Sequence, residues 1–136
     1  MIVLDCNAAS AIARDTLEGQ TFRAYMEQGD KVVAPRFFQV ESGNVVWKYV
    51  RAGNLLREEA KPMFERYVSL VDRFFPDEDL IVEAMHESIR LDYSVYDMLY
   101  FVLARRSGSI LITLDRKLQL LCMRHGVDCG ACIQDL

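Results

Sequence analysis

Several features that define specialised protein classes are missing from this chain of 136 residues. No apolar run approaches the roughly 18 residues that a membrane-spanning helix requires. The chain also does not open with a basic segment followed by an apolar one, as a secretory signal does. The four cysteines are therefore expected to be thiols in a reducing compartment rather than disulfides. Together these absences predict a cytoplasmic protein with no membrane segment.

An excess of positive charge is also missing, because 16 basic residues face 20 acidic ones and the net charge is −4. This balance argues against a passive nucleic-acid coat, whose affinity comes from basic patches. It does not exclude an enzyme that holds phosphates through metal ions. We find no repeat, linker or low-complexity tract, and a hydrophobic content of 51% is ordinary for a globular protein. A single domain over residues 1–136 is the expectation.

Short apolar stretches alternate with stretches of helical periodicity along the chain. Strands are expected at 2–5, 31–34 and 110–114, with a last short edge strand at 127–131. Helices are expected over 7–14, 16–28, 35–51, 54–74, from 77 onward, 94–107 and 116–124. This alternation predicts an α/β fold with a mostly parallel sheet.

Four carboxylates occupy informative places in this pattern. Asp5 and Asp115 each follow an apolar strand, Asp97 opens a helix, and Glu41 lies on the inner turn of another. In parallel sheets, ligands bind beyond the carboxyl ends of the strands. Acids held close together raise each other's pKa, so gathering them indicates a ligand that needs oxygen donors. A hard divalent cation, Mg²⁺ or Mn²⁺, is the commonest ligand of that kind.

Each acid also has a purely structural interpretation. Asp5 and Asp115 could cap the helices that follow them, and Asp115 could also contact a metal through water. Ser94 and Asp97 have the spacing of a capping box. Glu41 could lie on a solvated stripe of its helix, and Asp92 is expected to be a solvated loop residue.

Four stretches, in order, resemble the PIN domain, the nuclease fold of VapC-type toxins. They are residues 3–7 (VLDCN), 40–41 (VE), 95–104 (VYDMLYFVLA) and 111–115 (LITLD), and the resemblance covers nearly the whole chain. One difference is that residues 8–11 (AASA) are small where the family usually has bulkier apolar residues, which predicts room beside this helix.

The resemblance implies a three-layer α/β/α fold around a mostly parallel sheet of about four to five strands. It implies hydrolysis of RNA phosphodiester bonds with Mg²⁺ or Mn²⁺ as cofactor. The implied metal ligands and catalytic residues are Asp5, Glu41, Asp97 and Asp115, with Asn7 and Thr113 as supporting polar residues. The implied partners are an RNA substrate, a second copy in a homodimer and a cognate antitoxin protein.

Basic residues that could hold RNA phosphates lie in two pairs. Arg116 and Lys117 directly follow Asp115 and are the better candidates, whereas Arg105 and Arg106 more simply form a solvated face.

Three other functions compete with the nuclease. A PIN fold can hold RNA or a protein without cutting, and acid-to-amide changes would be harmless in such a binding module. A receiver-type phosphoacceptor also carries strand-end Asp residues, but its paired acids and late Lys are missing here. A zinc protein could use the tail residues Cys122, His125, Cys129 and Cys132; Cys122, however, follows helical leucines and is expected in the core.

Overall fold

A computed structural model describes residues 1–130 of the chain. The described part contains four strands, seven α-helices and two short 3₁₀ turns. The strands are β1 (Ile2–Leu4), β2 (Val32–Pro35), β3 (Arg73–Phe75) and β4 (Ile110–Ile112). The helices are α1 (Cys6–Ala13), α2 (Leu17–Met26), α3 (Phe37–Arg51), α4 (Ala60–Ser69), α5 (Ile81–Leu91), α6 (Val95–Ser107) and α7 (Arg116–Arg124). The 3₁₀ turns are η1 (Arg57–Glu59) and η2 (Asp77–Asp79).

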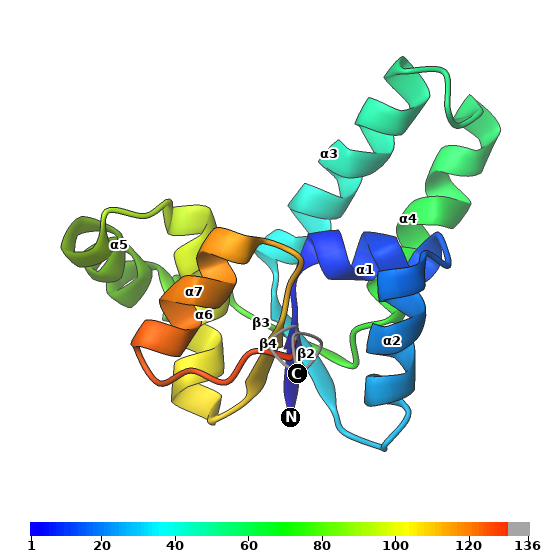
Figure 1. Cartoon of the computed structure of the whole chain (residues 1–136). Coiled ribbons are helices and arrows are strands. Elements are labelled where there is room, and N and C mark those ends of the chain that lie inside the picture. The colour runs from blue at the N-terminus through cyan, green and yellow to red at the C-terminus, as the bar shows by residue number, and fades with distance from the viewer. Residues whose placement is uncertain (131–136) are drawn as a thin grey trace.

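The strands form one parallel sheet in the order β3-β2-β1-β4. β1 lies inside the sheet, with Val3 opposite Val33 of β2 on one side and Leu111 of β4 on the other. Figure 1 shows α1 and α2 on one side of the sheet and α5, α6 and α7 on the other. The α/β class and the parallel sheet predicted from the alternating pattern are confirmed.

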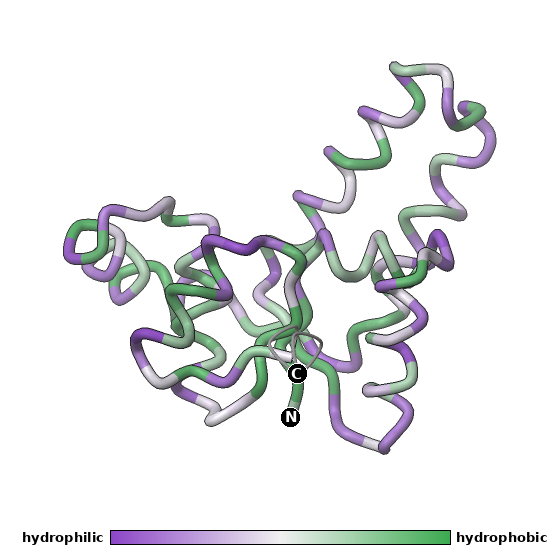
Figure 2. The backbone as a smooth tube through the Cα atoms, in the orientation of Figure 1, coloured by the Kyte–Doolittle hydropathy of each residue, from purple (hydrophilic) through white to green (hydrophobic). Residues whose placement is uncertain are grey.

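The core is built around the strands and α6. All three residues of β1 are fully buried, and every residue of α6 from Met98 to Ala104 is buried as well. This helix packs against β1, β2 and β4 on one side and against α5 on another, so it is apolar on nearly all faces. Figure 2 shows the hydrophobic stretches converging on the sheet at the centre of the molecule.

The helices α3 and α4 form an antiparallel pair that projects away from the sheet (Figure 1). Large apolar side chains are exposed on α3, at Val40 (66% exposed) and Trp47 (52%), and on the connection to α4, at Leu56 (64%). The Arg51 guanidinium lies 4.5 Å from the centre of the Trp47 ring and covers part of it. No helix in residues 1–130 is long and apolar enough to cross a membrane.

The prediction of one helix from Asn54 to about Phe74 is wrong. The helix α4 spans Ala60–Ser69 and is followed by the edge strand β3 (Arg73–Phe75). The change of structure occurs at Asp72, whose backbone N–H donates to the Val32 carbonyl and whose side chain accepts from the Val32 N–H at 2.8 Å. These long-range hydrogen bonds to β2 override a local apolar pattern that also fits a helix.

The last edge strand predicted at 127–131 is present only as a single bridge. Cys129 pairs with Leu111 of β4, and the Leu111 N–H donates to the Asp128 carbonyl at 2.9 Å. Residue 131 lies outside the described residues, as does Cys132 of the candidate zinc tail. Cys122 is fully buried, as expected for a core residue.

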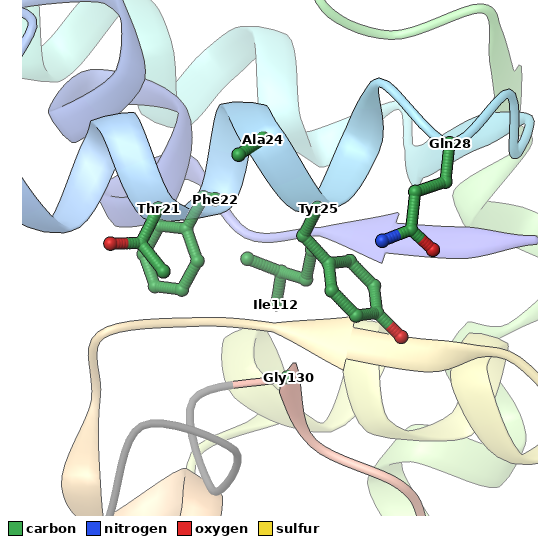
Figure 3. Close-up of a pocket in the computed structure, with 7 residues that line it drawn as sticks. All are labelled: Thr21, Phe22, Ala24, Tyr25, Gln28, Ile112 and Gly130. Carbon is green, nitrogen blue, oxygen red and sulfur yellow. The ribbon is translucent and has the colours of Figure 1, made fainter.

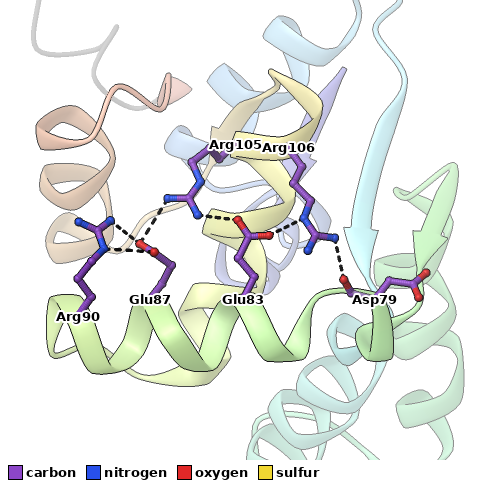
Figure 4. A network of polar contacts seen from close by, with 6 residues as sticks. All are labelled: Asp79, Glu83, Glu87, Arg90, Arg105 and Arg106. Carbon is purple, nitrogen blue, oxygen red and sulfur yellow. Dashed lines mark hydrogen bonds and ion pairs between the residues drawn. The ribbon is translucent and has the colours of Figure 1, made fainter.

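Of the two candidate pairs of phosphate-binding cations, Arg105 and Arg106 form ion pairs between α5 and α6. Arg105 and Arg106 each place a guanidinium nitrogen 2.6 Å from a carboxylate oxygen of Glu83 (Figure 4). Arg105 also lies 3.3 Å from Glu87, and Arg106 donates to the Asp79 carbonyl. Burial raises the pKa of Glu83, but the hydrogen bonds from the two arginines outweigh it and lower the pKa overall. These arginines therefore hold α5 against α6 rather than forming a free basic face.

Candidate active site

The first candidate acid, Asp5, stands where β1 ends and α1 begins. Its side chain caps the helix, since Oδ1 accepts a hydrogen bond from the Cys6 N–H at 2.7 Å. The second oxygen, Oδ2, accepts from the Thr113 hydroxyl at 2.8 Å. Asp5 is only 4% exposed and Thr113 is fully buried. Both carboxylate oxygens of Asp5 are therefore held in position.

The two supporting residues connect the ends of the neighbouring strands β1 and β4. Asn7 Oδ1 accepts from the Leu114 N–H at 2.9 Å and lies 3.3 Å from the Thr113 hydroxyl. The Thr113 hydroxyl also accepts from the Asp115 N–H at 3.1 Å. Asn7 and Thr113 thus fix the β4–α7 connection relative to Asp5, across a sequence separation of 108 residues between Thr113 and Asp5.

Glu41 lies in the second turn of α3, which begins just past the end of β2. Its Oε1 accepts a hydrogen bond from the Tyr100 hydroxyl of α6 at 2.5 Å. Tyr100 is 1% exposed, so its hydroxyl approaches Glu41 from the protein interior. This contact excludes the interpretation of Glu41 as a member of a freely solvated stripe.

The remaining two acids lie at helix N-termini, and only Asp115 is itself the cap. The Ser94 hydroxyl caps α6 by accepting from the Asp97 N–H, and it donates to Asp97 Oδ2 at 3.0 Å. Asp115 caps α7, because its Oδ1 accepts from the N–H groups of Lys117 and Leu118. The sequence predicted a cap at each of these two helix starts. Neither oxygen of the Asp97 carboxylate accepts from a backbone N–H within residues 1–130, and for Asp115 only Oδ1 does so.

Burial and mutual repulsion raise the pKa of three of the four acids. Burial, followed by repulsion from Glu41 and Asp97, raises the pKa of Asp5 to about 7. Burial and then Asp97 raise the pKa of Glu41, while the Tyr100 hydrogen bond opposes the change. Burial and then Asp115 raise the pKa of Asp97. The acids are therefore close enough for their charges to interact, and Asp115 interacts with Asp97.

The four acids are too far apart in this structure to form a complete metal site without movement of their side chains. Within residues 1–130, no three His, Cys, Asp or Glu side chains are gathered closely enough to form a ready-made metal cage. That observation also applies to Cys122, His125 and Cys129 of the candidate zinc tail. Asp92 ends α5 in a left-handed conformation and is exposed, as expected for a solvated residue.

Two tyrosines to which the sequence assigned no individual role lie close to the acids. Tyr100 contacts Glu41, and the half-buried Tyr93 has a pKa raised to about 12 by burial and then by Asp115 and Asp97. At the start of α3 and α6, Phe37 and Tyr96 stack with ring centres 5.0 Å apart. A helical spacing of four residues relates Phe37 to Glu41 and Tyr96 to Tyr100, which is the one signal that could have revealed this group.

An apolar pocket of about 190 Å³ lies elsewhere, between α2 and β4. Phe22 and Tyr25 line it from one side, with Ile112 and Gly130 on the other (Figure 3). None of the candidate acids lines this pocket, so it is separate from the candidate active site.

The pKa of Asp5 predicts how the stability of the metal-free protein depends on pH. An unfolded Asp ionises near pH ~3.9, whereas folded Asp5 keeps its proton up to about pH 7. Between these values the folded state binds more protons, so this contribution to stability is present at low pH. It is lost as the pH rises toward 7, by at most ~1.4 kcal/mol per pH unit.

Thermal unfolding in EDTA from pH 4 to 9 measures this contribution. The melting temperature of the wild type should fall relative to that of Asp5→Asn as the pH rises toward 7, with a constant difference above it. Parallel curves for the two proteins over the whole range would contradict a protonated, buried Asp5.

Comparisons with known proteins agree with this architecture. Ribonuclease VapC3 from Pyrobaculum aerophilum is 25% identical over 119 residues, covering 86% of this chain and 91% of that protein. The crystal structure of PAE2754 from Pyrobaculum aerophilum has a TM-score of 0.69 and 23% identity, covering 88% of this chain and 82% of the other. VapBC2 from Rickettsia felis, bound to a DNA fragment from its promoter, gives a TM-score of 0.62 at 15% identity, covering 85% and 88%. A family model of the PIN domain matches residues 2–122, and the chain therefore belongs to the PIN domain family.

Proposed function

We propose that this protein is a metal-dependent ribonuclease that hydrolyses RNA phosphodiester bonds. The observation that carries the proposal is the proximity of three buried or half-buried acids: burial raises the pKa of Asp5, Glu41 and Asp97, and repulsion from Glu41 and Asp97 raises the pKa of Asp5 further. Such repulsion is unfavourable unless a cation relieves it. The similarity to a protein named ribonuclease VapC3 supports RNA as the substrate.

The donor atoms at this site fit Mg²⁺ or Mn²⁺. They are carboxylate oxygens, the ligands that hard cations prefer, and no thiol or imidazole is among them. Mg²⁺ usually keeps several waters and takes one or two protein carboxylates, so a cage of three acids is not required. Asp5 and Asp97 would hold the cation, and Glu41 and Asp115 would help to hold it.

When bound, the cation supplies a water of lowered pKa and neutralises charge on the scissile phosphate. The protein residues hold the ligands in place around it. Thr113 and the α1 backbone fix Asp5, Tyr100 fixes Glu41, and the Ser94 hydroxyl fixes one oxygen of Asp97. Arg116 and Lys117, exposed at the start of α7, would attract phosphates of the bound strand.

The direct test is cleavage of a mixed pool of single-stranded RNA. Wild-type protein with Mg²⁺ or Mn²⁺ should shorten the RNA, and the same protein in EDTA should not. Product lengths on a sequencing gel provide the measurement, and catalytically silenced Asp5→Asn protein from the same purification is the control for contaminating nucleases. Binding of RNA without cleavage at any metal concentration would instead favour the PIN-fold binding module.

Replacing Tyr100 with phenylalanine tests how Glu41 is held. The variant keeps the buried ring but loses the hydroxyl that donates to Glu41 and lowers its pKa. We expect the pKa of Glu41 to rise further, which shifts the acidic limb of the pH–rate profile of cleavage to higher pH and reduces the rate by about tenfold at neutral pH. An unchanged profile would mean that the hydrogen bond has no part in the reaction.

We further propose that the protein is the toxin of a toxin–antitoxin pair and acts as a cytoplasmic homodimer. The similarity to VapC3 and to the VapBC2 complex supports an antitoxin partner. Apolar side chains exposed on α3 and α5, such as Val40 and Ile89 (76% exposed), are suitable for such contacts. Co-expression with the neighbouring open reading frame should yield a stable complex that no longer cuts RNA.

A further inference from the structure

A second pocket, of about 250 Å³, lies beside the candidate active site at the start of α7. It is lined by Leu91, Tyr93, Lys117, Leu120, Leu121 and Arg124. One wall is the connection from α5 to α6, and the other is a face of α7. Two of the lining side chains are cations, and none is an acid.

The pocket adjoins the acids at two points. The Lys117 N–H donates to Asp115 Oδ1 at 3.0 Å, so this wall begins at the fourth acid. On the opposite wall, Tyr93 lies close enough to Asp97 and Asp115 that both influence the pKa of its hydroxyl. A strand of nucleic acid with one phosphate at the acids would therefore continue into this pocket.

The charges in this pocket are not explained by the packing of the fold. Within residues 1–130, neither Lys117 nor Arg124 forms an ion pair. This contrasts with Arg105 and Arg106, which are fully engaged with Glu83. Lys117 also lies in the first turn of α7, where the helix dipole disfavours positive charge. A local conflict of this kind is expected where a residue serves a ligand.

The apolar part of the pocket suits a nucleotide rather than a free anion. The half-buried Tyr93 contributes an aromatic ring, and Leu120, 52% exposed, contributes an aliphatic surface. Aromatic rings bind the faces of unpaired bases, whereas cations hold the phosphates that connect them. The pocket therefore contains cations suited to a phosphate and, separately, apolar side chains suited to a base.

We propose that this pocket is a subsite for the nucleotide that flanks the scissile phosphate in single-stranded RNA, with Lys117 and Arg124 on its phosphate and Tyr93 and Leu120 against its base or sugar. The proposal rests on the ribonuclease function proposed above. It makes Lys117 and Arg124 determinants of substrate binding, whereas the acids determine the rate of the chemical step.

The test compares Lys117→Gln/Arg124→Gln with wild type on a pool of fluorescein-labelled single-stranded RNA octamers in Mg²⁺. Loss of two phosphate contacts should raise KM about tenfold, while kcat stays within about threefold. The slope of log(kcat/KM) against log[KCl] should become shallower by about 1.4, or about 0.7 for each cation removed. Lys117→Arg with Arg124→Lys should retain wild-type behaviour, since the charges remain.

Lys31→Gln is the matched control. Lys31 is an exposed cation just before β2, at the amino ends of the strands, whereas Asp5 follows the carboxyl end of β1. Removing its charge should change neither KM nor the salt slope. If the wild type cuts RNA and the Lys117→Gln/Arg124→Gln variant has the same KM and the same salt slope, the subsite proposal is wrong and the ribonuclease proposal stands. Wild-type protein that cuts no RNA would overturn the ribonuclease function and the subsite together.

Discussion

Replacement of Asp97 with asparagine is expected to reduce the rate of RNA cleavage by about 100-fold or more, equivalent to ~2.7 kcal/mol of transition-state stabilisation. Asparagine keeps an oxygen that can accept from Ser94, so the α6 cap is preserved. It removes the charge that the proposed divalent cation would need. Loss of one charged residue from the first helical turn should lower stability by at most ~1 kcal/mol. Initial rates on an RNA pool and thermal melting curves measure the two effects separately.

Asp92→Asn is the matched control for this variant. Asp92 is an exposed acid five positions earlier in the chain, in a left-handed conformation that asparagine adopts readily. This change should leave both rate and stability close to wild type. An Asp97→Asn protein that cuts RNA normally would show that Asp97 serves only the structure of the first turn of α6.

Replacement of Gly19 with alanine is expected to give the largest loss of stability. A Cβ atom at position 19 would overlap the backbone of α1, lying closest to the Ala11 carbonyl and 2.7 Å from the Ile12 nitrogen. Backbone atoms cannot rotate away, so α1 and α2 would have to separate. Such overpacking costs about 1–3 kcal/mol or more, and urea unfolding should record it as a lower midpoint.

Gly43→Ala provides the comparison within the same protein. Gly43 lies inside α3, and a Cβ atom there meets nothing within 4 Å. Alanine favours the helical backbone by about 0.5–1 kcal/mol over glycine, so this variant should be more stable than wild type. Equal effects of the two substitutions would mean that the close approach of α1 and α2 is not needed for stability.

Much of the fold could be predicted because it follows local rules. Apolar runs alternating with helical patterns indicate a parallel sheet, and Ser94 before Asp97 indicates where α6 begins. The short strand β3 could not be predicted, since Asp72 joins it to β2 only through long-range hydrogen bonds with Val32. The room predicted beside the small residues of α1 is not left empty, because α2 packs closely against that helix through Gly19.

The sequence and the resemblance indicate the four acids and the supporting residues Asn7 and Thr113, but not the contact between Tyr100 and Glu41. Strand-end and helix-start positions single out Asp5, Asp97 and Asp115 from sequence, and the PIN resemblance adds Glu41. No pattern within α6 indicates that the Tyr100 hydroxyl would meet Glu41, because the two residues are 59 positions apart in sequence. Pairing of this kind depends on how α3 and α6 pack, which only the folded structure defines.

The position of β1 inside the sheet has a consequence for the newly made chain. β1 is synthesised before its neighbour β4, which follows about a hundred positions later in the chain, since Asp5 and Thr113 are separated by 108 positions. Until then β1 has one unpaired edge, and Asp5 lacks the hydroxyl that holds it. An incomplete chain that lacks β4 therefore cannot assemble the contacts that hold Asp5.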